Sequence, residues 1–320
     1  MALKPVAART HSQLDEHLWV VVLAGGEGRR ISDFTRGPGG VPVPKQYFRF
    51  RDERTLLRTT LDRALRLTAP DRVVCLVLEE HRAWWELETG NLPPGNMLAQ
   101  PSGRGTAIAI LHGLDHIRLC DREARILVMP SDHEVEDEDV LLAALERAAR
   151  ACDELPDDLL LLGIVPSDAT DAEYGLVLPR AGDRTGAPRV RAFVEKPPAE
   201  VGAELIRRGA LWNSFIFACG ARTLLRLYGR TAPLLLEAYR RGAAQARDGG
   251  GALRRLFARL PEYDFSRDLL QRATSRLRLA AVPECGWTDL GTPPRLTRWL
   301  ERHRGAQYLS RSRPITTSPA

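Results

Sequence analysis

The sequence predicts an α/β protein with a doubly wound, mainly parallel sheet, because short apolar segments alternate with amphipathic helical patterns. The first apolar segment, 18–24, is β-branched and stops at Gly25, as expected of a buried strand. Ligands of such sheets bind beyond the carboxyl ends of the strands. Strands are also expected at 73–78, 125–129, 159–165, 174–179 and 190–195, and helices at 55–67, 106–118, 140–151, 223–239 (interrupted at Pro233) and 253–260.

Composition indicates a globular chain with a substantial core, since 44% of its 320 residues are hydrophobic and 27% are charged. We expect one catalytic domain over 18–302, an N-terminal extension over 1–17 and a disordered tail over 303–320, which is rich in Ser, Thr, Arg and Pro. No apolar stretch approaches the roughly 20 residues of a membrane helix, and the first 19 residues lack the apolar centre of a signal peptide. A cytoplasmic protein without membrane contact is therefore expected.

Charge and cysteine content argue against two further classes of protein. The net charge is +5, but the arginines are spread along the chain and no nucleic-acid-binding module accompanies them, so no nucleic-acid partner is expected. The five cysteines are scattered and form no CxxC pair of zinc-ligand spacing. They are expected to be reduced and structural.

The basic residues are almost all arginines: of 46, only Lys4, Lys45 and Lys196 are lysines. A site that needs a compact ammonium does not tolerate a broad planar guanidinium, whereas most surface positions accept either group. Lys45 and Lys196 are therefore candidates for phosphate contacts. Survival by chance is the alternative interpretation.

A glycine-rich segment follows the first predicted strand. It lacks the spacing of GxGxxG and of GxxxxGK[ST], so a plain turn and a phosphate cradle both remain open, although a nicotinamide-binding Rossmann oxidoreductase is disfavoured. Glycines at a strand end let backbone N–H groups approach phosphate oxygens. The candidate nucleotide-binding residues of this segment are Leu23, Ala24, Gly25, Gly26, Gly28 and Arg29, with Arg30 as a further phosphate ligand.

Two aspartates are candidate ligands for Mg²⁺. Asp132 directly follows a buried strand, where a carboxylate can hold the metal beside phosphates; a helix cap is the alternative. Asp289, in Gly286-Trp-Thr-Asp-Leu-Gly291, is the second candidate, with a turn aspartate as the alternative. His133 is expected to support the site rather than bind the metal, because Mg²⁺ prefers oxygen.

Taken together, the ordered motifs resemble those of the mannose-1-phosphate guanylyltransferase branch of the sugar-1-phosphate nucleotidyltransferases. The resemblance spans about residues 18–296 and is carried by LAGGEGRR, PKQ, QPSGRGTAIA, MPSDH, EYGLVLP, FVEKP, LWNSFIF, YDFSRDLLQRA and GWTDLG. It implies the Rossmann-like fold of the nucleotide-diphospho-sugar transferases. It also implies attack of a hexose 1-phosphate, mannose favoured, on the α-phosphorus of a nucleoside triphosphate, GTP favoured, with Mg²⁺ as cofactor.

The resemblance also implies roles for individual residues. Arg30 and Lys45 would hold the triphosphate, Asp132 and Asp289 the metal, and Lys196 the sugar phosphate. Glu195 and Asn213 would bond sugar hydroxyls, and the backbone at Gly175 would approach the hexose. A segment with Gln100, Gly103 and Thr106 would face the base; from the sequence alone it could equally be an N-terminal loop.

Several positions depart from the pattern of this family. Arg29 stands where Thr is usual, Gln100 replaces a common Glu, Gly105 a common Asn and Phe215 a common Gly. Either Arg29 or Arg30 could be the phosphate ligand, and another base or hexose could be used. A catalytically silent nucleotide-sugar sensor is the competing hypothesis. The chain could form a homodimer, but the sequence leaves the oligomeric state open.

Overall fold

The computed structural model describes residues 15–51, 54–167, 174–183, 185–247 and 251–303. Its strands are β1 (Leu18–Ala24), β2 (Val73–Leu78), β3 (Met97–Gln100), β4 (Arg125–Pro130), β5 (Leu159–Ile164), β6 (Leu176–Pro179), β7 (Val190–Val194), β8 (Leu211–Gly220) and β9 (Leu277–Val282). Its α-helices are α1 (Leu56–Leu65), α2 (Arg82–Glu88), α3 (Thr106–Cys120), α4 (Glu138–Glu154), α5 (Ala199–Arg207), α6 (Ala221–Thr231), α7 (Pro233–Arg247), α8 (Ala252–Arg259) and α9 (Pro293–Arg302).

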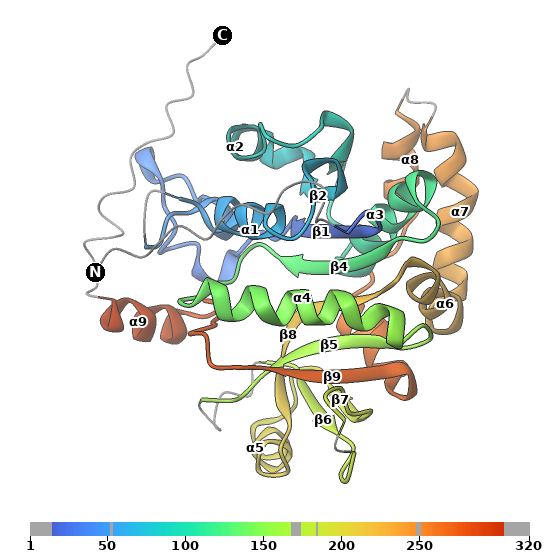
Figure 1. Cartoon of the computed structure of the whole chain (residues 1–320). Coiled ribbons are helices and arrows are strands. Elements are labelled where there is room, and N and C mark those ends of the chain that lie inside the picture. Colours follow the sequence, from blue (N-terminus) through green and yellow to red (C-terminus); the bar gives the residue numbers. More distant parts are fainter. Residues whose placement is uncertain (1–14, 52–53, 168–173, 184, 248–250, 304–320) are drawn as a thin grey trace.

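One sheet organises the described part of the chain, with the strand order β3-β2-β1-β4-β8-β5-β9. The pairs β3–β2, β2–β1, β1–β4 and β5–β9 are parallel, while β8 runs antiparallel to both β4 and β5. Strand β6 joins β7 and β8 in antiparallel fashion and, with α5, forms one end of the molecule (Figure 1). The predicted α/β class with a mainly parallel sheet is confirmed.

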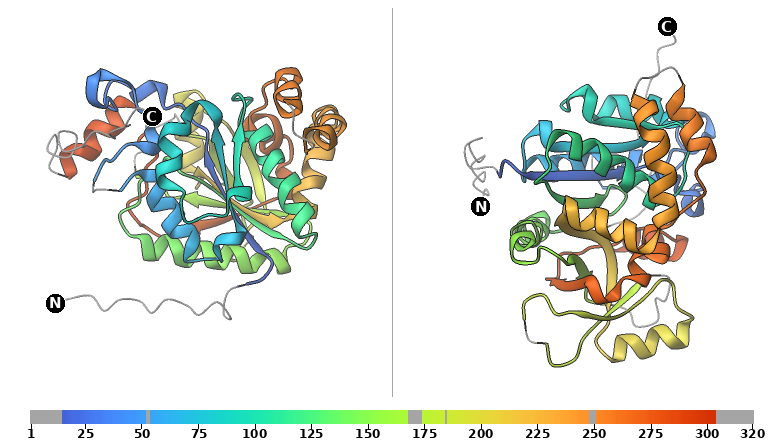
Figure 2. Two further views of the ribbon diagram at one scale, coloured as in Figure 1. Left: turned by 90° about the horizontal axis from the view of Figure 1, so that it is seen from above. Right: turned by 90° about the vertical axis from the view of Figure 1, so that its right-hand side faces the viewer.

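Helices cover both faces of this sheet because residues along β1 alternate between two cores. Leu18, Val20 and Val22 pack into one core together with α1 and α4. Trp19 and Val21 pack into the other, together with α3 and α6 to α8. Figure 2 shows these layers from two further directions.

The predicted elements are confirmed with shifts of a few residues at their ends. Pro233 separates α6 from α7, as expected of a residue that cannot continue a helix. The strand predicted at 174–179 begins at Leu176, and β3, β8 and β9 were not predicted. Strand β8 escapes sequence pattern analysis because Asn213 and Ser214 interrupt its apolar run.

The predicted terminal segments lie largely outside the described residues; of 303–320 only His303 is described, next to the end of α9. Among the described helices, none is long and apolar enough to cross a membrane. All five cysteines are free thiols, and all but Cys120 are buried, in agreement with a structural role.

Candidate active site

The glycine segment forms a loop at the carboxyl end of β1, and a neighbouring glutamine holds it in place. Gln46 Nε2 donates hydrogen bonds to the carbonyl oxygens of Ala24 (2.9 Å) and Gly26 (2.8 Å). Gly28 has φ +63°, and a Cβ there would lie 2.8 Å from Cβ of Lys45. A Cβ at Gly26 would meet nothing within 4 Å. The loop therefore packs against Lys45 on one side and is open at Gly26.

A cavity of about 640 Å³ lies beside this loop. The loop, the end of β3, the start of α3 and the end of β4 form its walls, which places it at the carboxyl ends of parallel strands. Of the predicted nucleotide-site and metal residues, those that line it are Leu23, Gly25, Gly26, Arg29, Arg30, Gln100, Gly103, Thr106 and Asp132. Both candidate arginines reach it, and Arg29 also pairs with Glu27.

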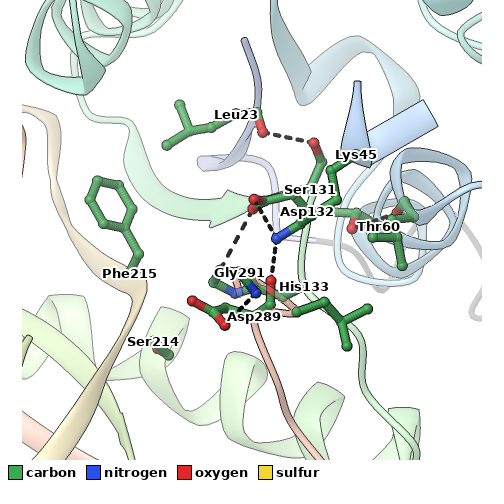
Figure 3. A network of polar contacts seen from close by, with 12 residues as sticks. Leu23, Lys45, Thr60, Ser131, Asp132, His133, Ser214, Phe215, Asp289 and Gly291 are labelled. Carbon is green, nitrogen blue, oxygen red and sulfur yellow. Dashed lines mark hydrogen bonds and ion pairs between the residues drawn. The ribbon is translucent and has the colours of Figure 1, made fainter. Parts of the chain in front are cut away.

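Lys45 lies between the two predicted metal carboxylate residues (Figure 3). Its side chain is only 3% exposed, its Nζ is 2.9 Å from Asp132 Oδ2, and it also donates to the main-chain carbonyl of Asp289. Burial pushes the pKa of Asp132 upward, but the interactions with neighbouring groups, of which the Lys45 ammonium is the foremost, together outweigh burial and hold this pKa below its usual value. Asp132 is thus a carboxylate at neutral pH.

Asp132 is no helix cap, because Asp137 caps α4: its side chain accepts a hydrogen bond from the Val140 N–H. Asp132 and Asp289 are instead brought together by backbone pairing between a residue shortly after Asp132 and the residue directly before Asp289. Glu134 and Thr288 exchange two backbone hydrogen bonds of 2.9 Å each. This bridge is the reason that two aspartates 157 positions apart in the sequence share one site.

Three donors orient the carboxylate of Asp289. Its Oδ1 accepts hydrogen bonds from Gly291 N (2.9 Å), Tyr174 Oη (3.2 Å) and Arg295 Nη1 (2.7 Å). Burial raises the pKa of Asp289, but Lys45 and Arg295 overcompensate, so the pKa is lowered and the group is ionised at neutral pH. The turn at Gly291 that the sequence suggested is present, and its N–H helps to fix the side chain of Asp289 within the cluster.

The two carboxylates suit a magnesium ion whose coordination would be completed by substrate phosphates. Among the described residues, no group of three or more His, Cys, Asp and Glu could hold a metal by itself. Mg²⁺ is commonly bound by one or two carboxylates together with substrate phosphates and waters. Two ionised aspartates, of which Asp132 lines the cavity, suit it.

His133 supports this cluster as a neutral ring. Burial lowers its pKa to about 4, and its Nδ1 accepts a hydrogen bond from Trp287 Nε1 (3.2 Å). Because Nδ1 is an acceptor, the proton is on Nε2, which lies 3.6 Å from Asp132 Oδ1. The ring therefore turns an N–H toward the carboxylate.

The predicted sugar-side residues form a second group, outside the lining of the cavity. The N–H of Asn213 donates to the Gly175 carbonyl (2.8 Å), and a Cβ at Gly175 would lie 2.6 Å from Glu195 Oε2. Burial, followed by the charge of Asp264, raises the pKa of Glu195. Lys196 is exposed at the end of β7 and does not line the cavity beside Lys45.

Comparison with known proteins is consistent with this arrangement. The family model described as nucleotidyl transferase matches residues 19–303. The chain belongs to the nucleotidyl transferase family. Its curated relatives include a xanthan biosynthesis protein XanB of Xanthomonas campestris pv. campestris, 29% identical over 85% of this chain and 57% of the relative. They also include a mannose-1-phosphate guanylyltransferase of Escherichia coli, 29% identical over 86% of this chain and 58% of the relative.

The chain therefore spans less than two thirds of the length of these two relatives. A solved structure named mannose-1-phosphate geranyltransferase, from Thermus thermophilus, superposes with a TM-score of 0.75 at 27% identity, covering 91% of this chain and 80% of the other. The fold of this nucleotidyl transferase is thus that of its relatives, and the resemblance inferred from the ordered motifs is confirmed.

Sequence reasoning missed three residues that shape the site of this nucleotidyl transferase. Gln46 fixes the glycine loop, and Tyr174 and Arg295 orient Asp289. Gln46 had one signal, its place beside Lys45. Arg295 had none, because one arginine among 43 does not stand out.

Backbone strain is concentrated at the same site. Among the described non-glycine residues, positive φ angles occur at Lys196 (47°), Phe215 (61°) and Leu290 (46°). Lys196 is itself a predicted site residue. Phe215 comes two residues after Asn213, and Leu290 comes directly after Asp289. Strained backbone of this kind clusters at functional sites, where the surroundings hold it in place.

Proposed function

We propose that this chain catalyses the reaction of mannose 1-phosphate with GTP to give GDP-mannose and pyrophosphate. The observation that carries the proposal is the cluster of Lys45, Asp132 and Asp289 beside the glycine-loop cavity. The names of the Escherichia coli and Thermus relatives support mannose 1-phosphate, and the former supports the guanylyl group.

The chemistry requires positioning and charge neutralisation rather than a general base. A phosphate monoester is largely dianionic at pH 7, since its second pKa is about 6. Its oxygen forms a bond to the α-phosphorus, the bond from that phosphorus to the bridging oxygen breaks, and pyrophosphate leaves with the electron pair. The protein must hold the two phosphates in line and compensate their charge.

The residues of the cluster divide these tasks. Lys45 supplies a buried ammonium, which its ion pair with Asp132 and its hydrogen bond to the Asp289 carbonyl hold in place. Arg29 and Arg30 supply forked donors at the cavity wall, suited to phosphate oxygens. Asp132 and Asp289 would hold Mg²⁺, which would neutralise phosphate charge when bound. On the sugar side, Glu195 and Asn213 offer polar groups for hydroxyls, and Lys196 offers a cation for the sugar phosphate.

Pyrophosphate release tests the proposal directly. The protein is assayed with Mg²⁺ and every pairing of four nucleoside triphosphates with mannose, glucose and N-acetylglucosamine 1-phosphates. GTP with mannose 1-phosphate is expected to be the best pair, and Asp132→Asn is expected to reduce its turnover at least a hundredfold. Turnover only with another pair would change the substrates, and binding without any turnover would favour a sensor. The cytoplasmic location and a homodimer stay predictions.

A further inference from the structure

Strand β8 contains a bulge of two residues that are not paired with any residue of β5 in the strand register. Leu162 pairs with Ile216 and Gly163 with Asn213, so Ser214 and Phe215 are extra. Ser214 Oγ donates to the Leu162 carbonyl (2.5 Å) and accepts from Ile216 N (3.1 Å). The Phe215 N–H donates to Asn213 Oδ1 (3.1 Å). The side chains of the two residues that precede Phe215 thus fix the bulge in one shape.

This shape forces Phe215 into a conformation that favours glycine. Its φ is +61°, and a bulky residue with positive φ is an outlier in proteins. A glycine would adopt the same backbone without steric cost. The phenyl ring is therefore retained against a local backbone preference, and packing or function must account for it.

Packing accounts for only part of it, because Phe215 packs against the edge of the core from a partly buried position. Phe217, two residues further along β8, is fully buried and stacks on Phe265 at a centroid distance of 4.9 Å. Phe215 is only partly buried, and its ring lies 6.2 Å from that of Phe265. Phe217 thus fills the core at this point, whereas Phe215 packs against the edge of the core and also lines the cavity.

Phe215 lies beside both halves of the site, because it lines the cavity and its N–H donates to Asn213 on the sugar side. On one side it shares the cavity wall with Leu23, Thr106 and Ala109. On the other side, the chain leads within two residues to Asn213, which hydrogen-bonds Gly175 on the sugar side. A ligand with its nucleotide in this cavity and its sugar at Asn213 would lie next to Phe215.

We propose that Phe215 is a specificity-determining residue, whose ring closes the wall between the two halves of the site and limits the size of the sugar accepted there. The inference rests on the proposed function, because it requires a sugar phosphate beside the nucleotide. A rigid apolar wall discriminates by excluding bulk, and a single extra or missing group in such a pocket changes selectivity by about 10- to 200-fold.

The test compares Phe215→Gly and Phe215→Leu with the wild type and with Phe217→Leu, a control in the same strand that contacts the same Phe265 ring. The measured quantity is the ratio of kcat/KM for N-acetylglucosamine 1-phosphate to that for mannose 1-phosphate. Phe215→Gly is expected to raise this ratio at least tenfold, Phe215→Leu by less, and Phe217→Leu by less than twofold. An equal change for both sugars in Phe215→Gly would overturn the proposal.

A binding measurement separates this inference from the proposed activity. Wild type and Phe215→Gly are titrated calorimetrically with GDP-mannose, UDP-N-acetylglucosamine, GDP and UDP. Opening the wall is expected to tighten UDP-N-acetylglucosamine relative to UDP at least fivefold, with GDP-mannose relative to GDP changed less. If the wild type releases no pyrophosphate, the activity fails but these ratios still decide the role of the ring. Unchanged ratios, or no binding of either nucleotide-sugar by both proteins, would refute it.

Discussion

Replacing Lys45 by arginine keeps the positive charge but is expected to reduce kcat/KM at least tenfold, equivalent to about 1.4 kcal/mol. The reason is space. The side chain is 3% exposed, its Nζ already lies 2.9 Å from Asp132, and Gly28 would touch Cβ of Lys45 if it carried a Cβ of its own. A planar guanidinium is broader than the ammonium held at this buried position and would have to displace its neighbours.

Replacing Lys45 by methionine keeps most of the volume and removes the charge. Loss of one preorganised donor to developing charge costs about 2.7–4 kcal/mol, so kcat/KM is expected to fall by about 10² to 10³. The ion pair with Asp132 is lost as well. Because Asp132 is 38% exposed, solvent screening limits the accompanying loss of folding stability to about 1–2 kcal/mol.

Both variants are assayed by pyrophosphate release at saturating Mg²⁺, with melting temperatures measured alongside. Arg222→Met serves as the matched control, because it removes a cation from an exposed ion pair with Glu123 on the surface. It is expected to retain activity within twofold. Near wild-type kcat/KM in a folded Lys45→Arg protein would refute the argument that this position needs a slender ammonium.

Three other outcomes are expected. Gly28→Ala should lower stability by about 1–2 kcal/mol and reduce activity, because φ of Gly28 is +63° and the new Cβ would meet Lys45. Gly26→Ala should melt like the wild type yet bind nucleotide more weakly. Equal melting temperatures for the two variants would contradict this. Asp289→Asn should raise the Mg²⁺ concentration for half-maximal activity at least tenfold, and an unchanged titration curve would remove Asp289 from the metal site. Burial lowers the pKa of His112 to about 4, so its contribution to stability is present above its unfolded pKa of about 6.5 and is lost as pH falls from there toward 4. Chemical denaturation of His112→Phe should therefore show a smaller decrease of the unfolding free energy with falling pH, by at most about 1.4 kcal/mol per pH unit. The same dependence of unfolding free energy on pH in both proteins would disprove it.

The place where the predicted nucleotide-binding residues meet could be inferred from local sequence. A buried strand that stops at Gly25, and another that runs into Asp132, define the same sheet edge, because the carboxyl ends of parallel neighbours meet there. The scarcity of lysine singled out Lys45 before its neighbours were known. The strands and their common edge are predictable because the periodicity of a strand and its end lie within a few consecutive residues.

Only the tertiary structure decided how the remaining groups meet. The Glu134–Thr288 bridge joins two distant loops, and Arg295 reaches Asp289 from α9. The bulge at Phe215 exists because β8 runs between β4 and β5, strands that are distant from it in sequence. Local pattern thus determined the strands, the glycine loop and the sheet edge at which the cavity lies. Long-range pairing decided the orientation of Asp289, the burial of Lys45 and the position of Phe215 at the cavity, because each of these depends on contacts between residues far apart in the chain.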